Sequence, residues 1–169
     1  MTDRQERALG RLLAIRDALS RGTVSPEWVV ISVCTTLETY CSEMLEELIK
    51  NHLASADKFE AELITAQKSD LNKSWHSRLK WLSVGFSMQL DDSSHQDLLA
   101  LIELRNAIAH NGHSFTSRQT ARYEEFLRHR KVLESNFGVL FHGAAFKVGP
   151  TSGDMAIRLG RKIALDFLR

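Results

Sequence analysis

The stretch SHQDLLALIELRNAIAHNG, residues 94–112, decides the fold, because its apolar residues recur with the period of an α-helix. With Leu98 set at 0° on a helical projection, the other apolar side chains spread from about 120° on one side of it to about 40° on the other: Leu101, Ile102, Leu104, Ile108 and Ala109. Arg105 falls at about 340°, in the middle of that apolar face. An unpaired buried charge is costly, so the guanidinium needs a partner or a purpose. The stretch therefore predicts a buried helix with Arg105 as its first candidate functional residue.

Length and composition are those of a globular protein with one domain. The chain has 169 residues, of which 43% are hydrophobic and 25% charged, which is enough to build a real core. No apolar run approaches the roughly 20 residues of a membrane span, so no membrane partner is expected. Residues 1–19 are amphipathic but contain three acids, which favours a first helix over a signal or transit peptide. Cys34 and Cys41 are interpreted as reduced core residues, which suits a cytoplasmic location.

Helical periodicity continues along most of the chain. It predicts helices over about 3–20, 26–54, 57–67, 75–86, 94–111, 117–136 and 153–169, and a short hairpin over 139–148. Ser25-Pro26 is a start signal for the second helix, and Ser93 with Gln96 resembles a capping box for the fifth. The predicted fold class is an all-α bundle with at most one small β appendage. We expect a single domain over 1–169, with a core at about 25–135 and a C-terminal appendage at 138–169.

Glu38 is a second charge placed on an apolar helix face. It projects between Cys34 and Cys41, inside the stripe of the long second helix. One acid and one base on the two most apolar helices predict an ion pair across the bundle, in which Glu38 holds Arg105 in a fixed rotamer.

A polar strip runs along the other side of the helix that carries Arg105. Asn106 and His110 are four residues apart and hence neighbours, and Glu103 lies one turn before Asn106. His110 is suited to proton transfer near neutral pH, and Asn106 could orient its ring. Arg105 and His110 are about 140° apart around the helix and do not naturally converge. Either the helix end is distorted, or two copies of the motif meet across a two-fold axis to form a composite cleft for a phosphodiester.

Charge is distributed unevenly along the chain. Residues 1–100 contain 11 Lys/Arg and 15 Asp/Glu, a net of −4, whereas residues 101–169 contain 11 and 6, a net of +5. A basic half beside a polar cleft favours a polyanionic partner, and Arg118 and Arg122 are the candidate nucleic-acid contacts. The alternative interpretation is a solvated helix face.

The segment Arg105-Asn106, three residues, then His110 resembles the signature of the HEPN superfamily. The order of helices is similar too: LETYCSEMLEEL (37–48) resembles the family's second helix, SRLKWL (77–82) its mid-bundle segment and RNAIAHNG (105–112) the motif proper. The resemblance covers roughly residues 25–135. It implies a compact bundle with an up-down core of four to five helices, a homodimer that brings two motifs together, and metal-independent endoribonuclease activity.

The resemblance also implies roles for individual residues. His110 would act as general base or acid at a ribose 2′-hydroxyl that attacks the adjacent phosphate. Arg105 would hold that phosphate, Asn106 would position His110 or the phosphate, and Glu38 would brace Arg105. Such cleavage would leave a 2′,3′-cyclic phosphate, and we expect neither a metal nor another cofactor.

One position departs from the family pattern. Some members carry a tyrosine two residues after the histidine, which a nucleotidyltransferase partner modifies, whereas this chain has Gly112 there. Neutralisation by that route is therefore not expected. Asn111 and His113 are the nearby polar residues, and His113 either assists in the cleft or is a solvated histidine at the helix end.

The leading hypothesis from the sequence is a HEPN-type ribonuclease, a toxin or defence effector acting on RNA, with a cognate antitoxin or defence-system protein as a possible partner. The alternative is a non-catalytic HEPN module that binds a partner protein or nucleic acid, with Glu38 and Arg105 serving the fold. A third hypothesis is a structural dimer whose charge asymmetry only aids solubility.

Overall fold

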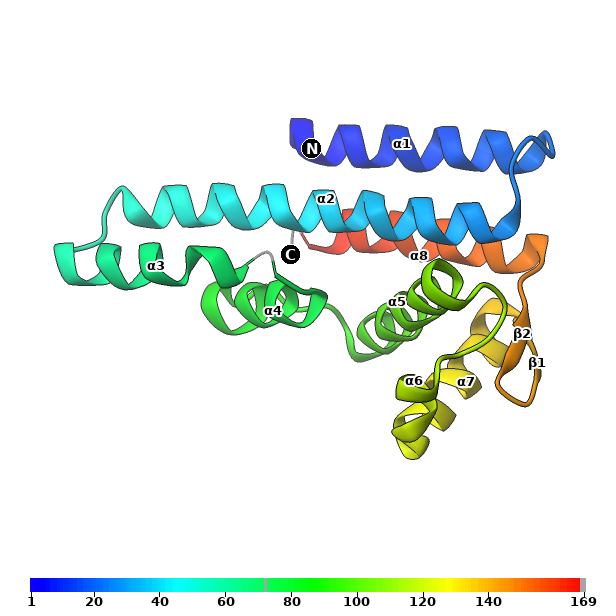
Figure 1. Ribbon diagram of the computed structural model, residues 1–169. Coiled ribbons are helices and arrows are strands. Elements are labelled where there is room, and N and C mark those ends of the chain that lie inside the picture. Colours follow the sequence, from blue (N-terminus) through cyan, green and yellow to red (C-terminus); the bar gives the residue numbers. More distant parts are fainter. Residues whose placement is uncertain (72, 168–169) are drawn as a thin grey trace.

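The computed structural model describes residues 1–71 and 73–167, and the fold is the expected all-α bundle with one short hairpin (Figure 1). The elements are α1 (Asp3–Ser20), α2 (Pro26–Leu53), α3 (Lys58–Leu71), α4 (Trp75–Lys80), the π-helical turn η1 (Trp81–Gly85), α5 (Asp92–Asn111), α6 (Ser117–Ala121), α7 (Tyr123–Phe137), β1 (Leu140–His142), β2 (Ala145–Lys147) and α8 (Pro150–Asp166).

Three long helices, α1, α2 and α8, form one side of the molecule (Figure 1). α1 runs antiparallel to α2 and α8. The helices approach closely at two glycines of α8: a Cβ on Gly160 would lie 3.0 Å from Leu12 and 3.1 Å from Val33, and a Cβ on Gly153 would lie 3.0 Å from Leu19. Glycine at these positions therefore permits the spacing of the three helices.

The start of α1 and the end of α8 are joined by buried hydrogen bonds. Gln5 Nε2 and Tyr40 Oη both donate to the carbonyl oxygen of Ala164, at 2.8 and 3.2 Å. The two ends of the chain therefore lie in one packed region on the bundle.

α5 crosses under this group of helices, and α7 packs against it (Figure 1). The C-terminal half of α2 extends past the ends of α1 and α8, with α3 and α4 below it. The large buried side chains that join α5 and α7 to α2 are Leu37, Leu98, Leu101, Leu104 and Leu133.

Most expected helices are confirmed within a few residues, and the differences have local causes. Asp91, not Ser93, caps α5, because its side chain accepts from the backbone N–H of Ser94 at 3.0 Å. The helix expected over 117–136 is broken at Arg122, whose φ of −89° and ψ of 68° are not helical. Residues 168–169 of the expected last helix lie outside the described residues.

The C-terminal segment 138–169 contributes more than an appendage. α8 begins at Pro150, and its buried side chains belong to the same core as α1 and α2. The sequence points the other way because a hairpin and a Gly-Pro break precede this last helix and resemble a domain boundary.

The hairpin supports the loop that follows α5. β1 pairs antiparallel with β2, and the loop joins β2 through a single bridge between Ser114 and Ala145: Phe115 N–H donates to Ala144 O and Phe146 N–H to His113 O, both at 2.9 Å. The Phe115 ring lies 5.3 to 5.8 Å from three other aromatic rings, those of Phe126, Phe141 and Phe146. This aromatic cluster holds the segment between α5 and α6 in place.

Candidate functional site

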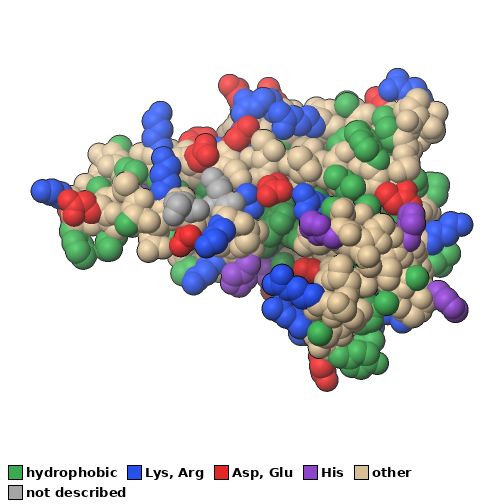
Figure 2. Space-filling model, viewed as in Figure 1, with side chains coloured by type: hydrophobic (Ala, Val, Ile, Leu, Met, Phe, Trp, Pro, Cys, Tyr) green, Lys and Arg blue, Asp and Glu red, His purple; other side chains and the backbone are tan. Residues whose placement is uncertain are grey.

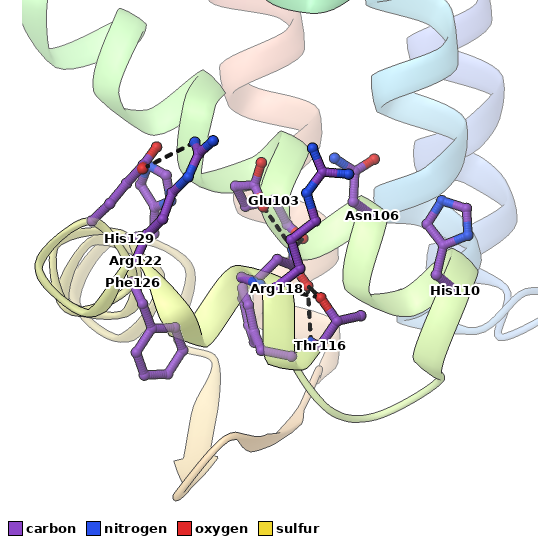
Figure 3. A pocket seen from close by; sticks show the side chains of 11 residues that line it. Glu103, Asn106, His110, Thr116, Arg118, Arg122, Phe126 and His129 are labelled. Carbon is purple, nitrogen blue, oxygen red and sulfur yellow. Dashed lines mark hydrogen bonds and ion pairs between the residues drawn. The ribbon is translucent and has the colours of Figure 1, made fainter.

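A cavity of about 350 Å³ opens between α5, α6 and α7 and contains four of the residues singled out from the sequence. Asn106 and His110 come from α5, Arg118 from α6, and Arg122 from the break between α6 and α7. The remaining lining residues are Glu103, Phe115, Thr116, Gln119, Glu125, Phe126 and His129. Figure 3 shows Asn106 beside the end of the Arg118 side chain, and His110 farther along α5 toward its C-terminal end.

The polar strip on α5 has the geometry that the sequence predicts. Asn106 and His110 lie one helical turn apart on α5 and both open into the cavity. α5 ends directly after them, because Gly112 adopts a φ of +69° that residues other than glycine rarely take. His110 therefore lies exposed at the mouth of the cavity, accessible to a large ligand.

Arg105 is half-buried, and it is not one of the described residues that line the cavity. Its Nη1 donates to Asn106 Oδ1 at 3.1 Å. Because Arg105 occupies the amide oxygen, the Asn106 side chain is left with its N–H₂ group to offer a ligand. Arg105 and His110 do not converge within one chain, as their 140° separation predicts.

The expected ion pair between Glu38 and Arg105 is wrong. Glu38 Oε1 lies 3.1 Å from the guanidinium of Arg78 on α4, which also donates from Nε to Ser42 Oγ at 3.0 Å. Arg78 is the more deeply buried arginine, with its side chain only 8% exposed, and it also stacks over the Trp75 ring at 5.9 Å. Glu38 therefore braces α4 against α2 and not the motif.

Arg105 and Glu38 nevertheless both lie near Cys34, where α2 crosses α5. The charges of Arg105 and Glu38 both act on the pKa of Cys34, which burial raises to about 12. The Cys34 thiol also lies 3.8 Å from the carbonyl oxygen of Leu101 on α5. α2 and α5 thus cross where the sequence places them, but α4 supplies the closer partner for Glu38.

Arg118 and Arg122 are the cations of the cavity. Arg118 extends from α6 along α5 toward Asn106 (Figure 3) and has no ion-pair partner among the described residues. Arg122 lies 3.4 Å from Glu125 at the other end of the cavity. In the space-filling view, Lys and Arg side chains gather beside α5 and α6 (Figure 2). The unpaired Arg118 is accordingly the side chain best placed to meet an anion.

The described residues that line the cavity do not include Asn111 or His113. Asn111 Nδ2 donates to the carbonyl oxygen of Ser114 at 3.2 Å, which closes the turn after α5. The exposed His113 ring lies edge-on to Phe146, 6.5 Å between ring centres. Both side chains belong to the connection between α5 and the hairpin.

His129 joins the site although the sequence places no functional residues around it. It lines the cavity from α7, and burial lowers its pKa, an effect that the charges of Glu103 and Glu125 oppose and that of Arg128 reinforces. The sequence offers little signal, because the break at Arg122 turns α7 toward α5 and no local pattern announces that break.

Gln119 is the other lining residue that sequence reasoning missed. Its Nε2 donates to the carbonyl oxygen of Glu103 at 3.0 Å and to the carboxylate of Glu103 at 2.6 Å. A capping box, Thr116 with Gln119 three residues later, is readable from the sequence, but it indicates only where a helix starts.

The arrangement provides hydrogen-bond donors and cations around a solvent-filled space, with a titratable imidazole at its mouth. Asn106 Nδ2 and the Arg118 guanidinium can bind a phosphate, and His110 can exchange a proton at an adjacent oxygen. No group of three or more His, Cys, Asp or Glu residues in 1–71 and 73–167 is arranged to hold a metal ion. Across the same residues, no helix combines the length and apolarity needed to cross a bilayer.

Comparisons with family models, curated proteins and solved structures find no match to this chain, so the site stands on its own geometry.

Proposed function

We propose that this protein is an endoribonuclease of the HEPN type that acts on RNA without a metal in the cytoplasm, as a toxin or defence effector. The observation that carries the proposal is the placing of Asn106, His110 and the unpaired Arg118 around one cavity. α5 supplies Asn106 and His110, α6 supplies Arg118, and α7 packs against both helices. A cation and an imidazole beside an open cavity suit the binding and cleavage of a phosphodiester.

In the proposed reaction, His110 removes the proton from a ribose 2′-hydroxyl, and the 2′-oxygen forms a bond to the adjacent phosphorus. The bond from phosphorus to the 5′-oxygen breaks, and that oxygen takes up a proton as it leaves. The products are a 2′,3′-cyclic phosphate and a 5′-hydroxyl. Arg118 and Asn106 Nδ2 stabilise the charge that develops on the non-bridging oxygens.

Arg105 enters the proposal through a second copy of the chain. Within one chain it bonds Asn106 and stays outside the cavity, so it would reach a phosphate only where two motifs meet in a homodimer. The proposed assembly therefore places His110 of one chain near Arg105 of the other. A cognate antitoxin or a defence-system protein would bind over this cleft to control it.

The test is cleavage of a mixed RNA pool in EDTA by wild type, His110→Ala and His95→Ala. His95 is an exposed histidine at the opposite end of α5, so it controls for the loss of an imidazole from this helix. We expect wild type and His95→Ala to yield RNA ending in 2′,3′-cyclic phosphate, and His110→Ala to lose about 10² to 10⁴ in rate. Equal cleavage by His110→Ala would remove His110 from the reaction.

A non-catalytic HEPN module is the second candidate, and the bond between Arg105 and Asn106 favours it, because that bond engages two motif residues within the fold. The same experiment separates the two proposals. Wild type that binds the RNA pool but leaves it intact under all conditions supports the module and contradicts the enzyme.

A further inference from the structure

α6 carries Arg118 into the cavity, yet this helix has little to hold it in place. It is five residues long, from Ser117 to Ala121, and none of its residues is buried. Apolar packing therefore contributes little to its position, and a helix of this length is unstable by itself in water. The aromatic cluster anchors Phe115, two residues before α6, and polar contacts hold the helix itself beside α5.

The side chain of Gln119 supplies those contacts in both directions. Toward its own helix, Gln119 Oε1 accepts from the backbone N–H and from the hydroxyl of Thr116, both at 3.1 Å. Toward α5, Gln119 Nε2 donates to the backbone and the side chain of Glu103, at 3.0 and 2.6 Å. The carboxamide thus uses both its oxygen and its nitrogen to join the start of α6 to α5 (Figure 3 marks the bonds at Thr116 and Glu103).

The residue before Gln119 is Arg118, and the residue three positions after Glu103 is Asn106. Fixing Gln119 on Glu103 therefore fixes where the Arg118 backbone lies along α5, one turn from Asn106. The Arg118 side chain then extends along α5 toward Asn106 (Figure 3). Because Arg118 has no ion pair of its own among the described residues, no other charge holds it there.

We propose that Gln119 is a positioning residue, which through Glu103 holds Arg118 in the cavity in the conformation that receives an RNA phosphate. This inference rests on the proposed function, since it assigns Arg118 a phosphate as its ligand. Because the backbone that carries Arg118 is already held in place, less conformational freedom is lost on binding, so the clasp between Gln119 and Glu103 raises affinity without touching the RNA.

One substitution breaks the hydrogen bonds between Gln119 and Glu103, and a second substitution at Glu103 restores a bond between the two side chains. Gln119→Glu keeps an oxygen for Thr116 but replaces the donor with a second carboxylate facing Glu103. The double variant Glu103→Gln with Gln119→Glu exchanges the two groups and restores the bond between the side chains, while the bond to the carbonyl oxygen of residue 103 stays lost. Arg158→Ala is the matched control for Arg118→Ala, because Arg158 is an exposed arginine on α8, away from the cavity.

The first measurement is binding of a short 2′-O-methyl RNA, which cannot be cleaved by attack of its 2′-oxygen, as a function of salt concentration. We expect Arg118→Ala and Gln119→Glu each to reduce the slope of log affinity against log salt by about 0.7, the value for one phosphate contact on a single strand. The two changes together should reduce it no further, and the exchanged pair should recover the wild-type slope. Arg158→Ala should leave the slope unchanged.

The second measurement, hydrogen exchange at the amides of 117–121 without RNA, reports on the clasp alone. We expect faster exchange in Gln119→Glu and recovery in the exchanged pair. If exchange rises while the salt slope stays at the wild-type value, or if the losses from Arg118→Ala and Gln119→Glu add, the positioning role is wrong and the proposed function stands. If wild type neither binds nor cleaves RNA, the proposed function fails, whatever the exchange data show.

Discussion

At the scale of single residues, Arg78 and Arg105 both contradict the apolar pattern around them, and of the two only Arg78 is buried. Arg78 lies within the helical series Trp75, Leu79 and Leu82, just as Arg105 lies within that of α5. The structure buries Arg78 and pairs it with Glu38, whereas Arg105 is half-buried and bonds the neighbouring Asn106. The same pattern in the sequence thus marks one structural arginine and one beside a candidate site.

This difference predicts unequal effects on stability. Arg78→Ala should lower the free energy of unfolding by about 2 kcal/mol, because it removes the partner of Glu38, whose partial exposure softens the loss. Arg105→Ala should cost less than about 1 kcal/mol, since the arginine is half-buried and its partner is uncharged. Urea unfolding followed by circular dichroism measures both, and equal losses would contradict this assignment of roles.

His129 predicts a dependence of stability on pH. Burial lowers the pKa of His129 in the folded protein below its ordinary value of 6.5, so between these two pKa values the unfolded chain binds the extra proton. The contribution of His129 to the free energy of unfolding is therefore fully present above pH 6.5. It is lost as the pH falls through the lower pKa of the folded state. We expect His129→Asn to flatten the slope of unfolding free energy against pH below 6.5. An unchanged slope in urea titrations across this range would show that His129 is not its source.

At the scale of elements, the bundle depends on how closely its helices approach. The two glycines of α8 face α1 and α2 with no room for a Cβ, and a seven-residue spacing places them on the same side of α8. By contrast, Gly10 of α1 is exposed, with no atom within 4 Å of a Cβ. The same residue type therefore serves close packing in one helix and no evident purpose in the other.

The two positions form a matched pair for substitution by alanine. Gly10→Ala should stabilise the protein by about 0.5 to 1 kcal/mol, because glycine is a poor helix former. Gly160→Ala should destabilise it by about 1 kcal/mol, because the strain of a methyl group against buried Leu12 and Val33 exceeds that gain. Thermal unfolding checks the sign, and an increase in midpoint for Gly160→Ala would refute close packing at this contact.

Periodicity and capping residues predict most of the helices of this fold, because these signals are recorded locally in the sequence. Pro26 at the first turn and Gly112 after the last turn are examples, and both mark real helix ends. The pairing of Glu38 could not be predicted, because it depends on where α4 lies relative to α2. The place of His129 depends in the same way on the break at Arg122. Asn106 and His110 could be placed together because they share one helix.

At the scale of the whole molecule, the proposed composite site requires residues from two chains. This requirement can be tested by mixing two variants, Arg105→Ala and His110→Ala, each expected to be inactive. After subunits exchange at random, half of the dimers are mixed, and each mixed dimer holds one intact site of two. Activity should therefore return to about a quarter of the wild-type level.

Recovery of activity on mixing would place Arg105 and His110 of different chains in one site. No recovery, in a sample that sedimentation shows to be dimeric and exchanging, would contradict the composite arrangement. The cavity of a single chain, with Arg118 as its cation, would then have to account for all cleavage.

β1, β2 and α8 follow the candidate site in the sequence and complete its support. The loop that carries Phe115 pairs with the backbone at Ala144 and Phe146, and α8 fills the core between α1 and α2. A nascent chain still tethered to the ribosome before Ala145 therefore lacks both supports, although its Asn106 and His110 have already been translated. The site is therefore expected to become complete only after β2 and α8 have both left the ribosome.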